Sequence, residues 1–214
     1  MEFQAYRDLA SLAFVRCISP IPGSTNHAEG VGFSLRTATE KCRSEVLERS
    51  FVRALTTEQQ SQILGIAAHP EEKAAEEHAW CESLETLFLE ALAEGRSLRG
   101  LTMPLPGRIN LHLSRIDGRW ITLFGFPHDG AHALVQAASK TLWLALLRTW
   151  SEFRNLKIYR PSATELSRYT KGNRILGNRI ASIKLNAGLT NALGAVPASI
   201  HSNKLSTHFI VYFK

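Results

Sequence analysis

The chain has 214 residues, a hydrophobic content of 44% and a formal net charge of +6, which fits one generous globular domain or two small ones. It lacks the roughly 20 uninterrupted apolar residues of a membrane span, and its amino terminus lacks a signal-peptide pattern. Cys17, Cys42 and Cys81 have no close pairing, which favours free thiols over disulfides. We therefore expect a soluble, cytoplasmic protein without a membrane partner.

The charge is unevenly distributed along the chain. Residues 1–107 carry 10 Lys and Arg against 15 Asp and Glu, whereas residues 108–214 carry 15 against 4. A basic half beside an acidic half suits a nucleotide, a nucleic acid or an acidic peptide. A solvated surface without a ligand is the alternative.

The first half of the chain predicts two long helices. Ser34 can cap a helix whose apolar residues recur at helical spacing up to the sequence "RALTTEQQ". A second helix is expected from Pro70 to Leu92, with glutamates in its first turn. Before them, residues 9–18 read as a strand or short helix, and residues 19–32 as a loop rich in proline and glycine.

The second half predicts a hairpin, a third helix and a final strand. Two alternating runs flank Asp117-Gly118, a strong hairpin signal, after a turn at "MPLPG". The other expected elements are a helix over residues 128–153, a short helix over 161–169, a loop-like stretch over 170–194 and a strand over 207–213. We expect a single compact domain, 1–214, containing a basic, weakly structured segment, 154–206.

The two long helices repeat each other. A shift of 37 residues superimposes eight identical pairs: Ala38/Ala75, Glu40/Glu77, Glu45/Glu82, Leu47/Leu84, Glu48/Glu85, Phe51/Phe88, Ala54/Ala91 and Leu55/Leu92. Each helix therefore carries a Glu-x-x-Glu pair on one face, and packing the helices together would converge four carboxylates on a site suited to Mg²⁺. The alternative is that these glutamates only stabilise exposed helices.

Two stretches carry a resemblance to a known family. "GVGFSLRTATEKCRSEVLER", followed by "GIAAHPEEKAAEEHAWCESLET", resembles the YcaO superfamily, which has a glycine-serine approach to an ExxER helix, a G-x-A-A-H-P turn and a second acidic helix. The resemblance implies an α/β (α+β) fold, a sheet packed by helices, that binds ATP and Mg²⁺. Family members modify ribosomally made peptides, most often as azoline-forming cyclodehydratases.

The resemblance also implies roles for individual residues. Ser34, Arg49 and the four repeated glutamates would form the nucleotide site; Glu45, Glu48, Glu82 and Glu85 would hold Mg²⁺. Arg49 would pair with a phosphate or brace the carboxylates, and Gly30 and Gly32 would let a ligand approach the backbone. His69, inside the family turn, is the candidate catalytic residue.

The implied reaction requires a peptide and partner proteins. A Cys, Ser or Thr side chain of the precursor peptide attacks the preceding amide carbonyl, ATP phosphorylates the resulting oxygen, and loss of phosphate leaves a thiazoline or oxazoline. The expected partners are a leader-binding protein or a flavin dehydrogenase, which carries FMN and oxidises the azoline to an azole.

Three positions depart from the family pattern. Lys41 stands where the family usually has serine, Thr86 where arginine often follows the second acidic pair, and Arg148 where an acidic residue is expected. Lys41 and Arg148 would neutralise the glutamates without metal or nucleotide, so ATP use stays open. The alternatives are a catalytically silent scaffold subunit and a basic nucleic-acid-binding module built on residues 154–184, which the acidic first half argues against.

Overall fold

The computed structural model describes most of the chain as two compact units. The described residues are 1–7, 13–93, 100–128, 131–158, 199–205 and 207–214. The first unit comprises Met1–Ser83 and Pro197–Lys214, and the second comprises Leu84–Val196. Helix α3 (Glu72–Ala93) passes from the first unit into the second. The assignment of residues 1–214 to one domain stays a prediction.

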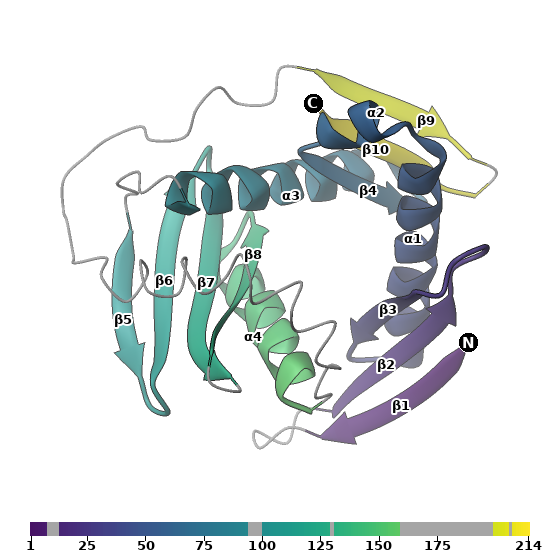
Figure 1. Ribbon diagram of the computed structural model, residues 1–214. Coiled ribbons are helices and arrows are strands. Elements are labelled where there is room, and N and C mark those ends of the chain that lie inside the picture. The colour runs from purple at the N-terminus through teal and green to yellow at the C-terminus, as the bar shows by residue number, and fades with distance from the viewer. Residues whose placement is uncertain (8–12, 94–99, 129–130, 159–198, 206) are drawn as a thin grey trace. The chain divides into compact units, whose positions relative to one another are not determined.

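The first unit contains two antiparallel sheets. One sheet has the order β1-β2-β3, with strands Glu2–Arg7, Ala13–Pro20 and His27–Gly32, and helix α1 (Leu35–Ala54) packs on β2 and β3 (Figure 1). The other has the order β4-β10-β9, with strands Gly65–His69, Phe209–Phe213 and Ile200–Lys204. The short helix α2 (Thr57–Ser61) lies between α1 and β4 in the chain.

Each long helix of the first unit packs through small residues. Ala38 and Cys42 of α1 join the buried cluster under β2 and β3, and their repeat equivalents in α3, Ala75 and Ala79, join the cluster under β4 and β10. The 37-residue repeat is therefore also a repeat of the packing face. Small side chains let each helix backbone approach its sheet closely.

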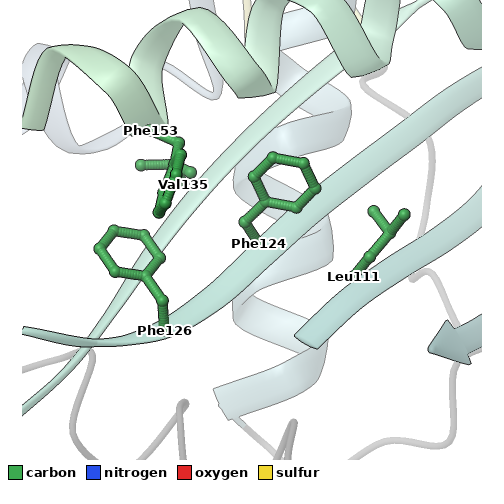
Figure 2. Packing of buried hydrophobic residues seen from close by; sticks show 5 residues of the cluster. All are labelled: Leu111, Phe124, Phe126, Val135 and Phe153. Carbon is green, nitrogen blue, oxygen red and sulfur yellow. The ribbon is translucent and has the colours of Figure 1, made fainter. Parts of the chain in front are cut away.

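The second unit is a four-stranded antiparallel meander covered by a helix. Its strands are β5 (Leu101–Leu105), β6 (Ile109–Ile116), β7 (Arg119–His128) and β8 (Ala131–Ser139), in the order β5-β6-β7-β8, and α4 (Leu142–Ile158) packs on β7 and β8. The core between helix and sheet is a group of aromatic and branched side chains: Leu111, Phe124, Phe126, Val135 and Phe153 (Figure 2). Phe126 and Phe153 meet edge to face, with ring centroids 4.6 Å apart.

Several predicted elements are confirmed. Helix α1 begins directly after Ser34, α3 occupies the second predicted helix, and β10 forms the final strand. The hairpin also forms, with Asp117 and Gly118 both at positive φ, 45° and 72°, as a turn of type I′ requires.

Other predictions are wrong because tertiary packing overrides local signals. Residues 27–32 form a strand rather than a loop, and residues 65–69 form a strand rather than a turn. Residues 103–105, predicted to lie in a turn, belong to β5. The first part of the predicted helix 128–153 is strand β8. The alanine-rich β8 has low strand propensity, but it pairs with β7 along its whole length. Pro104 is accommodated because β5 is an edge strand.

The segment 154–206, which the sequence predicts to be weakly structured, has regular secondary structure at both ends. Helix α4 continues to Ile158, and β9 occupies Ile200–Lys204. Residues 159–198, which include the predicted short helix and most of the basic segment, lie outside the described residues. Of the helices that the structure describes, none has the length and apolar character needed to cross a membrane.

Candidate functional site

Ser34 lies at the start of α1 as its N-cap. Its Oγ accepts a hydrogen bond from Thr37 N at 3.1 Å, and its own backbone is extended. The side chain therefore satisfies one of the amides that a helix start leaves unpaired. This is a structural role within α1, while its predicted part in nucleotide binding stays a prediction.

We expect Ser34→Ala to destabilise the protein by about 1 kcal/mol, because an N-cap is lost. Ser34→Asp, which can still accept the Thr37 amide, should keep most of the stability. Urea unfolding measures both variants. Equal stability of wild type and Ser34→Ala would contradict the capping role.

Gly30 and Gly32 pack against α1 rather than opening the backbone to a ligand. A Cβ at Gly30 would lie 2.2 Å from the carbonyl oxygen of Ala38, and a Cβ at Gly32 would lie 2.9 Å from Ala38 N. Both glycines are buried. The expectation that they admit a ligand is wrong because α1 occupies that space.

Three of the predicted glutamates gather in the first unit. Glu48 Oε1 accepts a hydrogen bond from Ala68 N at 2.6 Å, and Glu82 Oε2 accepts one from Ile66 N at 3.3 Å. β4 is an edge strand, so among the described residues no further strand accepts hydrogen bonds from these amides. Glu48 of α1 and Glu82 of α3 thus hold the outer edge of β4 from two helices.

Glu48 is the electrostatic centre of this carboxylate cluster, which we define as Glu45, Glu48 and Glu82. Burial raises the pKa of Glu48 well above its ordinary value, and the nearby carboxylates of Glu82 and Glu45 raise it further. The amide of Ala68 acts in the opposite direction but does not compensate. A positive charge placed here would relieve a repulsion that the fold itself creates.

Arg49 braces the cluster from outside. Its guanidinium forms an ion pair with Glu45 one turn earlier and donates to the carbonyl oxygen of His27 at 3.5 Å. The arginine therefore ties α1 to the start of β3. Of the two roles that the sequence allowed, this contact matches the bracing one.

His69 ends β4 and begins the connection to α3. Its Nδ1 accepts a hydrogen bond from Glu71 N at 3.0 Å, so a neutral ring carries its proton on Nε2. The ring meets His78 edge to face, with centroids 5.6 Å apart. His69 is half-buried in the same unit as the carboxylate cluster, and its catalytic role stays a prediction.

Glu85 belongs to the second unit and has a different environment. Its Oε1 accepts a hydrogen bond from Ala138 N at 2.6 Å, and Arg148 Nη1 donates to the carbonyl oxygen of the same Ala138 at 2.9 Å. Burial raises the pKa of Glu85 to about 7, while Arg148 and the Ala138 amide oppose the rise. The carboxyl therefore titrates much closer to neutral pH than an ordinary glutamate does.

Comparison with solved structures identifies the fold. The chain is similar to a structure described as YcaO from Methanopyrus kandleri bound with AMPPCP and Mg²⁺, with a TM-score of 0.65 and 12% sequence identity over 100% of this chain and 84% of that one. The chain has a YcaO-like fold. No family model matches the sequence, and no curated protein matches it.

The carboxylate cluster of this YcaO-like fold meets some of the requirements of a Mg²⁺ site and not others. Carboxylate oxygens are the ligands that Mg²⁺ prefers, and the mutual repulsion around Glu48 fits a cation. Among the described residues, however, no group of three or more His, Cys, Asp or Glu side chains is arranged to hold a metal ion.

Sequence reasoning missed the backbone groups that the glutamates bind. The YcaO-like fold places an edge-strand amide opposite Glu48, Glu82 and Glu85 in turn. A signal was present, because alanine-rich strands precede α3 and α4, but strand edges cannot be assigned before the sheet order is known. Arg148, which the sequence predicts as a neutralising group, donates to the carbonyl oxygen of Ala138, the residue whose amide binds Glu85.

Proposed function

We propose that this protein is a YcaO-type enzyme of ribosomal peptide maturation, which binds ATP and Mg²⁺ and forms azolines from Cys, Ser or Thr in a precursor peptide. The observation that carries the proposal is the carboxylate cluster of the first unit, in which Glu48 of α1 accepts the Ala68 amide and Glu82 of α3 accepts the Ile66 amide. Burial raises the pKa of Glu48, and the nearby carboxylates of Glu82 and Glu45 raise it further. Support comes from the fold, which is shared with a YcaO structure bound with AMPPCP and Mg²⁺.

In this proposal, Glu45, Glu48 and Glu82 would hold Mg²⁺, and Arg49 keeps Glu45 in place through its ion pair. ATP bound with Mg²⁺ supplies the phosphoryl group that carries away the amide oxygen. His69, with Nε2 available as a donor in the neutral ring, would move a proton during cyclisation. A leader-binding protein or a flavin dehydrogenase carrying FMN would be the partner.

The first test is calorimetric titration of the protein with ATP in excess Mg²⁺. We expect binding by the wild type and at least about tenfold weaker binding by Glu48→Gln, which keeps the acceptor for Ala68 N but lacks the charge. Glu40→Gln is the matched control, because Glu40 is on the same helix and pairs with Arg36 at the surface. No binding by a folded wild type would contradict the proposal.

The second candidate is a catalytically silent scaffold of such a peptide-modifying complex. The observation that favours it is that Glu48, Glu82 and Glu85 all accept backbone hydrogen bonds, which gives each a structural role without any ligand. A scaffold would support product formation by its partners equally well with Glu48→Gln. An enzyme would lose product while remaining folded.

A further inference from the structure

Strand β9 is an edge of its sheet, and its register shows which of its backbone groups point outward (Figure 1). Lys214 N donates to Ser199 O at 3.2 Å, and Leu205 N donates to His208 O at 2.7 Å. In an antiparallel pair, residues that bond the partner strand alternate with residues that do not, so the odd-numbered residues of β9 bond β10. The backbone N–H and C=O groups of the others point away from β10: Ile200, Ser202 and Lys204.

The outer edge of β9 differs from those of β4 and β8. Glu48 and Glu82 accept the outward amides of β4, and Glu85 accepts one of β8. Within the described part of the chain, neither a strand nor a side chain bonds the outward backbone groups of β9. An added strand would therefore find its hydrogen-bonding partners at β9 without displacing a described carboxylate.

The side chains of β9 define which strand fits it. Ser202 Oγ donates to Glu72 Oε1 at 2.6 Å, so this side chain lies on the face of the sheet that α3 covers. Ile200 and Lys204 share that face because strand side chains alternate, and Ile200 is 50% exposed. An added strand would gain from an apolar side chain beside Ile200 and a carboxylate beside Lys204, whereas Glu72 repels a carboxylate at the centre.

We propose that β9 is the docking strand for the precursor peptide, which adds antiparallel to it and carries a carboxylate opposite Lys204 and an apolar side chain opposite Ile200. That the peptide is the precursor rests on the proposed function. Antiparallel addition continues the pairing of the whole sheet. Because the two strands then run in opposite directions, the apolar residue follows the carboxylate by four positions in the peptide.

A second copy of the chain fits this edge less well than such a peptide. If β9 paired with another β9 about Ser202, Lys204 would lie opposite Ile200, and the partner strand would offer no carboxylate. A lysine on an exposed edge strand is a common device against pairing between copies. The charge of Lys204 therefore favours an acidic peptide over self-association.

Fluorescence anisotropy with a labelled synthetic peptide tests the docking strand. The peptide is rich in threonine, with one glutamate and a valine four positions later. Ser202→Pro should weaken its binding at least about tenfold, because proline lacks the outward N–H but removes no bond to β10. Ser202→Ala, the matched control, loses only the bond to Glu72 and should bind within about twofold of the wild type. Equal binding by the wild type and Ser202→Pro would overturn the proposal.

N-methylated peptides test the same contact on the wild type, so the test holds even if Ser202→Pro does not fold. Methyl groups on the peptide amides that face β9 should weaken binding at least about tenfold, since each blocks a hydrogen bond to the edge. Methyl groups on the intervening amides point away from β9 and should leave most of the binding. Equal losses from the two patterns would show that the peptide does not add as a strand.

A charge exchange at Lys204 tests the preferred peptide. The wild type should bind the glutamate peptide at least about fivefold more tightly than the same peptide with lysine in that position, and Lys204→Glu should reverse the preference. Moving the glutamate to the position opposite Ser202 should also weaken binding to the wild type, because Glu72 lies there. An unchanged preference in Lys204→Glu would overturn the assigned register.

Failure of this proposal is distinguishable from failure of the proposed function. A wild type that binds the peptide at β9 but does not bind ATP with Mg²⁺ supports the docking strand and contradicts the proposed function. A wild type that binds ATP but not the peptide overturns the docking strand alone. Sedimentation without peptide covers the remaining case: a dimer that Ser202→Pro dissociates would assign β9 to a second copy and overturn the proposal.

Discussion

Replacing Gly65 by alanine is expected to destabilise the folded protein by about 3 kcal/mol or more. A Cβ at this position would lie 2.3 Å from the carbonyl oxygen of Ala79 and 2.4 Å from Ser83 N. These are backbone atoms of α3, so neither can move without shifting the helix. Displacing α3 from β4 would also separate Glu82 from the amide of Ile66.

The matched control is Gly118→Ala. No atom lies within 4 Å of its added Cβ, but φ is +72°, so only backbone strain of about 1 kcal/mol is expected. Urea unfolding of the two variants beside the wild type separates crowding from strain. A smaller loss for Gly65→Ala than for Gly118→Ala would show that α3 does not press on β4.

Glu85→Gln is expected to become more stable relative to wild type as the pH rises from about 4.5 to 7. The folded pKa of Glu85 is raised to about 7 from an ordinary value of 4.5. The protonated carboxyl therefore contributes its full stabilisation of the folded protein below the unfolded pKa. This contribution is lost as the pH rises through the folded pKa. Glutamine does not titrate. The difference in the free energy of unfolding between Glu85→Gln and the wild type should grow by about 2 to 3 kcal/mol across this pH window.

Denaturant unfolding of both proteins at pH 4.5, 6 and 8 measures this difference. Other titrating groups, Glu48 among them, are common to the two proteins and cancel in the comparison. Glu90→Gln, at an exposed position of the same helix, is the matched control variant. A constant difference between wild type and Glu85→Gln would mean that the fold does not perturb this carboxyl.

The helices were predictable because their signals are local. Ser34 marks the start of α1 by its capping chemistry, and the apolar spacing and the 37-residue repeat follow from side chains on one helix face. Asp117-Gly118 marks its hairpin for the same reason, since the turn type depends on two residues alone. The resemblance to YcaO proteins rested on these helices, and the structural comparison shows a YcaO-like fold.

The strands β3, β4 and β8 were not predictable, because their identity depends on distant partners. Gly30 and Gly65 are normally breakers, yet in this fold they are the contact points that let a helix lie on its strand. Alanine-rich β8 is a strand because β7 provides its hydrogen bonds. Local propensity contains no information about either partner.

The sequence by itself determined which residues are acidic and on which helix face they lie, since helical spacing fixes both. Only the tertiary structure decided what those acids do. It surrounds Glu48 with other carboxylates and gives Glu85 an arginine from α4. The physical reason is that a carboxylate's pKa and partners depend on burial and on charges that the chain brings from far away in sequence.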